Sequence, residues 1–498
     1  MKNKALSLLL AALMLAVIAV TATACFPDDG NGNGEIPLPT DEIPQPNDQM
    51  YELTIWGGDE YMGESGVLVR QFCSDFNNSP LSQELKVKIS FTAMAGLPTA
   101  LQGALLANRG PDLVIWDRFA TPSNTDVLYP LNALIERDEI DLGVFNQEAT
   151  KELAYRGAQF GLPLDLDPWG IVVNMDIVNA YNNSAAEADR IDIDTDLQTW
   201  SGLREVGNKL TVRNGTTVTR AGLNTTSMDG QFFSFVFSAG GEVINTDEEH
   251  PDYGDTRLTT PIDEYGYRIM DTLSYFKNLY GLNLSNAGLG GEQQFAEGKL
   301  AMTFGSMYFP QRLKEYTQTE MNIRFVPYPQ RDLRYYGGGA TESNPVSIDP
   351  TEQNAGLQNG LYGGMLGGYG LAIAYPDEPF RSEAWRMRVA KSWHLIKAWL
   401  LNDDLNMQYC TTTRQITSRL SLTDHEYYST ADAKLLSQAI PYLEYFRMRP
   451  NVAGYEPFEA NVVRSQIQRM YEGDTVATVY QSIRSQGNSL LRQAQGRN

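Results

Sequence analysis

Short apolar blocks alternate with polar residues along the first part of the chain. Residues 51–58, 85–91 and 111–117 alternate or run apolar and favour strands, whereas residues 67–76 and 99–107 carry apolar side chains at helical spacing. The order strand, helix, strand, helix, strand predicts a parallel sheet with helices on its faces. In such sheets ligands bind at the carboxyl ends of the strands.

The mixture of strands and helices continues to the C-terminus. Residues 334–364 are rich in glycine and polar side chains, which predicts a loop or an insertion. Apolar runs predict buried strands at residues 171–173, 298–308 and 367–373. Helical spacing predicts helices at residues 200–210 (with Thr199 as N-cap), 232–237, 265–280, 384–401, 434–443, 459–471 and 476–494.

Residues 161–174 lead from a turn into an apolar strand. Gly161 and Pro163 favour the turn, and Asp165, Asp167 and Trp169 come before the apolar run. We interpret this segment as a crossing between two lobes that also lines the cleft between them. The alternative is an ordinary turn before a core strand, with Trp169 as packing.

Two further segments have the pattern of crossings. Residues 325–329 are held extended by Pro327 and Pro329, and residues 367–373 turn at glycines before entering a strand. With these crossings, residues 51–163 and 328–368 are predicted to form an N-terminal lobe, and residues 164–327 and 369–498 a C-terminal lobe.

The first 24 residues have the pattern of a secretory signal. Lys2 and Lys4 precede an apolar run that is too short to serve as a spanning helix, and small residues stand directly before Cys25. This pattern resembles the lipobox of bacterial lipoproteins, which implies a lipidated Cys25. A plain secretory signal with an incidental Cys25 is the alternative. Residues 25–50, rich in Asp, Gly, Asn and Pro, are predicted to form a disordered tether after the lipidated cysteine.

Charge and cysteine content narrow the function. The formal charge is −22 and becomes −24 without Lys2 and Lys4, so the surface repels nucleic acid and anionic lipid, and we expect no nucleic-acid partner. The length exceeds that of one typical domain. Cys73 and Cys410 are the only thiols besides Cys25, and the sequence does not say whether they pair.

No reactive constellation characteristic of an enzyme is found. His250, His394 and His425 are far apart in sequence and lack the spacing of metal ligands. The alternate aspartates at 192–196 suggest a calcium loop, but Leu197 and Leu203 stand where glycine and glutamate are needed. We therefore predict no catalytic residue, no metal and no cofactor.

The order of several short motifs resembles the family 1 extracellular solute-binding proteins, the sugar-capture lipoproteins of ABC importers. The resemblance covers residue 51 to the C-terminus, and residues 334–364 depart from it. The motifs that carry it are residues 53–56, 110–114, 128–131, 160–163, 173–176, 199–203, 295–302, 367–373 and 471–473.

The resemblance implies a fold and a function. The fold is α/β and periplasmic-binding-protein-like, with two α/β lobes joined by a three-segment hinge and a ligand cleft between them. The function is capture of a sugar or oligosaccharide for an ABC permease, by a monomer that a lipid anchor holds on the extracytoplasmic face of the membrane. Hinge closure buries the ligand of such proteins.

Aromatic rings match the apolar faces of sugars, and carboxylates accept hydrogen bonds from sugar hydroxyls. Residues of these types at strand ends and crossings are therefore predicted to line the cleft. They are Trp56, Trp116, Asp117, Asp165, Asp167, Trp169, Met307, Tyr308 and Tyr369. A surface-anchored polysaccharide hydrolase or lyase remains the alternative function, because an acidic chain also offers many carboxylate pairs.

Overall fold

The computed structural model describes residues 35–282, 284, 291–336, 339–341, 344–348 and 363–497. The chain divides into two units, residues 1–35 and residues 36–498, and the second contains all the elements below. The predicted signal segment and Cys25 lie outside the described residues, as does most of the loop predicted at 334–364. Across the described part of the chain, no helix combines the length and the apolar character needed to cross a membrane.

The first lobe is built on a five-stranded sheet. Its strands are β1 (Tyr51–Gly57), β2 (Val87–Ala93), β3 (Leu113–Asp117), β6 (Gly161–Pro163) and β16 (Tyr369–Ile373). Their order is β2-β1-β3-β16-β6, with β1 parallel to β2 and β3, and with β16 antiparallel to both of its neighbours, β3 and β6. The parallel sheet predicted for the start of the chain is confirmed.

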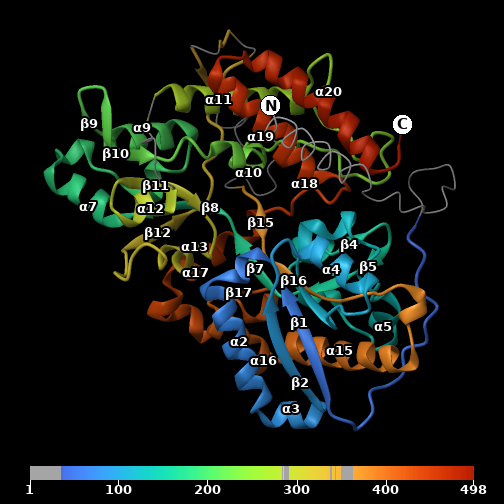
Figure 1. Cartoon of the computed structure of the whole chain (residues 1–498). Helices are drawn as coiled ribbons and strands as arrows, with labels where there is room; N and C mark the ends of the chain where they lie inside the picture. The colour runs from blue at the N-terminus through green and yellow to red at the C-terminus, as the bar shows by residue number, and fades with distance from the viewer. Residues whose placement is uncertain are drawn as a thin grey trace, which may run out of the picture. The chain divides into compact units, whose positions relative to one another are not determined.

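Helices cover both faces of this first sheet (Figure 1). On one face lie α2 (Glu64–Asn77), α3 (Pro80–Leu85), α15 (Glu383–Leu401) and α16 (Asp403–Thr413), and on the other lies α4 (Leu97–Leu106). Shorter elements complete the lobe: η1 (Asp59–Met62), η2 (Arg118–Ser123), α5 (Asn132–Arg137), α6 (Gln147–Lys151), β4 (Ala154–Tyr155), β5 (Ala158–Gln159) and α17 (Lys434–Ala439).

The second lobe contains another five-stranded sheet, in the order β12-β8-β11-β10-β9. Its strands are β8 (Gly170–Asn174), β9 (Val212–Asn214), β10 (Thr217–Leu223), β11 (Leu300–Gly305) and β12 (Ile323–Val326). On one face pack α7 (Met175–Ser184), α8 (Ile193–Asp196), α9 (Trp200–Leu210), α10 (Phe232–Ser238) and α11 (Glu264–Gly281), and on the other α12 (Gly291–Ala296) and α13 (Phe309–Leu313).

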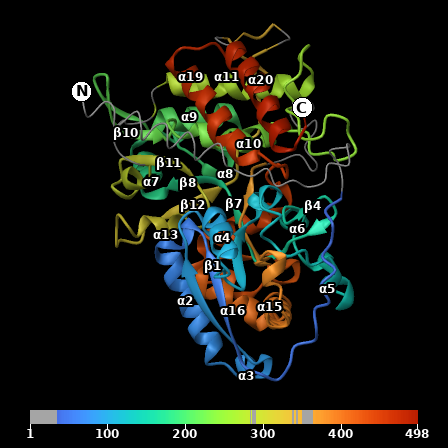
Figure 2. The same cartoon turned by 45° about the vertical axis from the view of Figure 1, so that its right-hand side comes forward.

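The C-terminal helices also belong to the second lobe. They are α18 (Tyr455–Pro457), α19 (Arg464–Glu472) and α20 (Val476–Ala494), and their apolar residues join those of α10 and α11 in one core. Helices α19 and α20 lie beside α10 and α11 in Figure 2. The remaining strands β13 (Leu333–Arg334) and β14 (Val346–Ser347) pair with each other. Local signals are also confirmed, since the Thr199 hydroxyl accepts a hydrogen bond from the Gly202 N–H at 3.2 Å and caps α9.

Three segments pass between the lobes. The first runs from β6 through β7 (Asp165–Pro168) to β8, where the sequence places a crossing. The second runs from β15 (Leu366–Gly367) to β16, and the third follows residue 446. A small sheet, β15-β7-β17, holds the first two together, with β17 (Ile416–Thr417) at its edge.

The predicted crossing at residues 325–329 is wrong. After β12 the chain stays in the second lobe, because Tyr328 and Tyr335 are buried in the same core as Phe235 and the Tyr335 N–H donates to Asp271 at 2.8 Å. The prolines make the segment extended, but an extended segment can equally run along one lobe. The third crossing, which the sequence did not reveal, lies where residue 446 packs in the first lobe and residue 452 in the second.

The lobe boundaries change accordingly. Residues 328–365 belong with the second lobe instead of the first, and β16, α15 and α16 belong with the first instead of the second. Helix α17 contacts both lobes, because its apolar residues share the core of the first lobe and its Gln438 accepts from the Phe325 N–H of β12 at 2.7 Å. The alternating or apolar pattern of each element is the same in either lobe, so the pattern predicted the elements but not their assignment.

Part of the predicted tether packs against the first lobe. The Ile36 N–H donates to the Arg156 carbonyl at 3.2 Å, and Ile43 packs on the core while its carbonyl accepts from Arg137 at 3.1 Å. Further along, the Asn47 carbonyl accepts from Lys391. The prediction of disorder therefore fails for residues 36–49, because basic side chains of the first lobe bind a segment that has little apolar surface of its own.

Candidate functional site

The two carboxylates of β7 lie at the seam between the lobes. Asp165 is 0% exposed and Asp167 is 6% exposed. An Asp165 oxygen accepts from the Tyr369 N–H of the first lobe at 2.8 Å, and an Asp167 oxygen accepts from the Met307 N–H of the second at 2.6 Å. The first crossing thus presents one carboxylate to each lobe.

Tyrosines from both lobes surround these carboxylates. Tyr308, 2% exposed, follows β11 in the second lobe, and its hydroxyl lies 3.5 Å from an Asp165 oxygen and 3.4 Å from the Tyr61 hydroxyl. The Tyr369 ring is 5.1 Å from that of Tyr61 and 6.0 Å from that of Tyr308. The structure therefore brings together five residues that the sequence selected: Asp165, Asp167, Met307, Tyr308 and Tyr369.

Burial changes the acidity of this cluster. Burial raises the pKa of Asp165 to about 6, opposed by the hydrogen bond from Tyr369 and the charge of Arg118. Burial, with the nearby charge of Glu60, raises the pKa of Asp167 to about 7, opposed by the Met307 N–H. Both carboxyl groups therefore exchange protons close to neutral pH.

Ion pairs connect the lobes beside this cluster. Arg312 on α13 lies 3.4 Å from Glu60 of η1 and 3.6 Å from Glu292 of its own lobe. Lys314 lies 2.9 Å from Glu64 at the start of α2. These side chains are partly exposed, so each pair contributes little by itself and is screened by salt.

A buried arginine connects the crossings. Arg118, which is 0% exposed, donates from Nε to Glu152 at 3.0 Å and from its terminal nitrogens to the carbonyls of Asp165 at 2.7 Å and Gly367 at 2.6 Å. The other Glu152 oxygen accepts from Nε of Arg449 at 2.9 Å. One Arg–Glu–Arg cluster therefore contacts all three crossings, and we call it the hinge cluster.

The three predicted tryptophans have different environments. Trp169 is partly buried where β7 meets β8, and its indole lies against Gly367. Trp56 is partly buried at the end of β1. Trp116 is only 1% exposed and packs with Leu101 under α4, so the structure does not bring it together with Tyr308 and Tyr369. Its position on β3 turns it to the α4 face of the sheet, which strand alternation alone does not identify as core or cleft.

Asp117, the remaining predicted residue, joins the hinge cluster. Its carboxylate accepts from Arg449 at 2.7 Å, and its side chain is 39% exposed. The guanidinium carbon of Arg449 also lies 4.0 Å from the ring centre of Phe119. Asp117 is thus anchored by an ion pair and still open to solvent.

The sequence analysis missed several residues of the seam. Glu60 and Tyr61 directly follow the first strand and its two glycines, a position that already drew attention to Trp56. Arg118 directly follows Asp117 in the same way. Arg312 and Arg449 carried no local signal, because Glu60 and Asp117, the residues that they bind across the seam, lie more than two hundred residues away.

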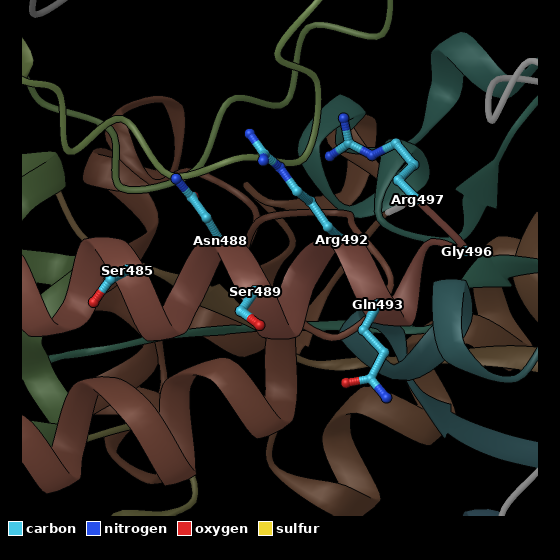
Figure 3. A pocket seen from close by; sticks show the side chains of 7 residues that line it. All are labelled: Ser485, Asn488, Ser489, Arg492, Gln493, Gly496 and Arg497. Carbon is cyan, nitrogen blue, oxygen red and sulfur yellow. The ribbon is translucent and has the colours of Figure 1, made fainter.

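Two surface depressions lie elsewhere. One of 620 Å³ lies along α20 (Figure 3), where Arg492 and Arg497 both pair with Asp255, and one of 210 Å³ lies between α8 and β12. Neither is lined by a residue that the sequence predicted for the site. Among the described residues, no group of three His, Cys, Asp or Glu side chains is placed to hold a metal ion.

Both Cys73 and Cys410 are buried and free. Burial raises the pKa of Cys73 to about 12 and raises that of Cys410 further. The question that the sequence left open is therefore answered: these thiols do not pair, and burial keeps them protonated and unreactive.

Comparison with known families identifies the class of this protein. A family model described as "Bacterial extracellular solute-binding protein" matches residues 82–374, and the chain belongs to this family. A search of curated proteins finds no match.

Solved structures share the fold. One is an ABC substrate-binding protein from Listeria monocytogenes in complex with cycloalternan, at 14% identity and a TM-score of 0.63, over 90% of this chain and 100% of that chain. Another is a cyclic alpha-maltosyl-1,6-maltose binding protein from Arthrobacter globiformis, at 18% identity and a TM-score of 0.63, over 89% and 100%. A third is the sugar-binding protein MalE from Xanthomonas citri, at 14% identity and a TM-score of 0.62, over 89% and 98%. The predicted periplasmic-binding-protein-like fold is confirmed.

Proposed function

We propose that this protein captures a sugar or oligosaccharide between its lobes and delivers it to the permease of an ABC importer. The observation that carries the proposal is the seam itself, where Asp165 and Asp167 of the first crossing meet Tyr308 and Tyr369 from opposite lobes. Aromatic faces and carboxylates are the groups that sugar recognition needs. The structural neighbours named above bind sugars, and family membership supports an extracytoplasmic binding protein.

The proposed ligand site consists of half-buried and buried groups around the crossings. Trp56 and Trp169 offer partly exposed rings, and Asp117 offers a partly exposed carboxylate. Asp165, Asp167, Met307, Tyr308 and Tyr369 become accessible when the lobes separate.

A thermal-shift screen against sugars tests this proposal. A ligand that binds only the folded protein raises its melting temperature. At a ligand concentration of about a hundred times Kd, the free energy of unfolding increases by about 2.7 kcal/mol. The panel includes maltotriose, mannotriose and cyclic oligosaccharides, with sorbitol as a control for nonspecific polyol effects. If no sugar shifts the melting temperature beyond sorbitol, the proposal fails. A bound sugar that is recovered intact after long incubation argues against the alternative of a hydrolase or lyase.

We also propose that Cys25 is lipidated and holds a monomeric protein on the extracytoplasmic face of the cell membrane. Two or three acyl chains bind a bilayer far more strongly than one. Replacing Cys25 with serine is therefore expected to move the protein from the membrane fraction to the soluble fraction of cells. Cys73→Ser, which changes a buried thiol, is the matched control and should leave the protein on the membrane. If the Cys25→Ser protein stays in the membrane fraction, another element anchors it.

A further inference from the structure

Residues 306–314 of the second lobe carry a series of contacts to the first lobe and to β7. The Met307 N–H donates to Asp167 of the first crossing, and Tyr308 enters the space between Tyr61 and Tyr369. Further along, Arg312 and Lys314 reach the acidic residues at the start of the first lobe.

Tyr308 gains its partners only while the lobes touch. Its hydroxyl is buried between Tyr61, which belongs to the first lobe, and Asp165, which belongs to the crossing. A buried phenol hydroxyl normally requires such a partner, whereas in separated lobes water would take that place. The ring also packs edge-on against Tyr369, a contact that likewise depends on closure.

Two ion pairs between the lobes also favour the closed state. Glu60 and Glu64 lie in the first lobe, and Arg312 and Lys314 lie in the second. Each pair attracts the lobes toward each other, and because the side chains are partly exposed, salt weakens the attraction.

Closure also buries two carboxyl groups that titrate near neutral pH. Asp167 faces Glu60 and Arg312 and is bonded by the Met307 N–H, and burial raises its pKa to about 7. Burial also raises the pKa of Asp165 to about 6. The charged and titratable groups that face Asp165 are the Arg118 cation, the Asp117 anion and the hydroxyls of Tyr61, Tyr308, Tyr369 and Tyr409. In separated lobes, water would return both pKa values toward about 4.

We propose that residues 306–314 form a latch that holds the two lobes together before any ligand is bound, and that the latch takes up protons as it closes. An acid whose pKa is higher in the closed state favours closure below that pKa. Its contribution is complete near pH 4 and is lost as the pH rises through 6 to 7. Acid therefore favours the latched state, and alkali favours separated lobes. The proposal goes beyond ligand capture, because it concerns the protein without ligand.

Energy transfer between two labels, one on each lobe, measures the latch directly. Gln83 on α3 and Thr216 beside β10 are exposed and lie in different lobes, so the full-length chain with Cys25→Ser, Gln83→Cys and Thr216→Cys accepts a dye pair. The native Cys73 is buried and its thiol is protonated, as is that of Cys410, so both react slowly with maleimide.

The expected result is a large pH dependence without ligand. Between pH 5.5 and pH 8, the ratio of closed to open molecules should fall by about a hundredfold, because the raised pKa of Asp167 supplies about thirtyfold and that of Asp165 about fourfold. Asp167→Asn should reduce this dependence to about fourfold, the part that Asp165 supplies. A ratio that stays constant between these pH values overturns the proton uptake.

Two substitutions test the assignment to residues 306–314. Tyr308→Phe removes only the hydroxyl, and Lys314→Gln removes only one charge; both should shift the molecules toward the open state. Tyr316→Phe and Lys299→Gln are matched controls on the same lobe, since Tyr316 is exposed and Lys299 pairs with Glu297 of its own lobe. Closed fractions that are the same in all four variants, with unchanged melting temperatures, overturn the latch. So does a ratio of closed to open molecules that does not fall when salt is raised from 0.05 M to 1 M at pH 5.5.

Discussion

Replacing Arg118 with methionine is expected to lower the free energy of unfolding by about 3–5 kcal/mol. The side chain is completely buried and donates to Glu152 and to the carbonyls of Asp165 and Gly367. Methionine fills a similar volume but provides no donor, so three carbonyls, those of Asp165, Gly367 and Tyr369, and one carboxylate lose a partner in a place that water does not reach. The cost of such unpaired groups exceeds the cost of losing the charge pair itself.

Denaturant unfolding of the variant measures this loss. Arg190→Met is the matched control, because Arg190 is exposed, and its effect should stay within about 0.5 kcal/mol. Glu152→Gln alone should also destabilise the protein, and the double variant with Arg118→Met should cost less than the two single losses together, because both act on one network. If Arg118→Met unfolds at the same denaturant concentration as the unchanged chain, the hinge cluster has no structural role.

The local parts of this fold could be predicted from the sequence. The cap at Thr199 depends on a few neighbouring residues. The turn predicted at Gly161 and Pro163 is wrong, because residues Gly161–Pro163 are extended and pair with β16 as strand β6. Asp165 and Asp167 could be selected for the same reason, since polar residues that lead into a buried strand require an explanation. Their environment, a seam between two lobes, then followed from the resemblance to two-lobed binding proteins.

The distant parts could not be predicted from single segments. Glu60 and Arg312 are 252 residues apart, and nothing near either residue indicates the other. The prolines at 327 and 329 make the chain extended, but only the packing of Tyr328 shows that it stays in one lobe. The environment of Trp116 could not be predicted for a related reason. Its strand position fixes the face of the sheet on which it lies, but α4, which packs on that face, is a separate segment.

Replacing Trp169 with alanine is expected to weaken binding of the sugar found in the screen by about thirtyfold or more. Trp169 lies between β7 and β8, and its backbone N–H donates to the Met365 carbonyl at 3.2 Å. Its side chain is only partly buried. Both the first and the second crossing therefore hold this residue in place, at the seam where a ligand would be enclosed. An aromatic anchor in such a desolvated site typically accounts for about 2 kcal/mol or more of binding free energy.

Trp116→Ala is the contrasting variant for this experiment. Because Trp116 is a fully buried core residue, its truncation should cost about 3–5 kcal/mol of folding stability, well above the loss for Trp169→Ala. Titration calorimetry and melting curves on both variants separate binding from packing. Sugar affinity that is unchanged in Trp169→Ala, together with a melting temperature lowered as far as that of Trp116→Ala, would show that Trp169 packs the hinge and does not contact the ligand.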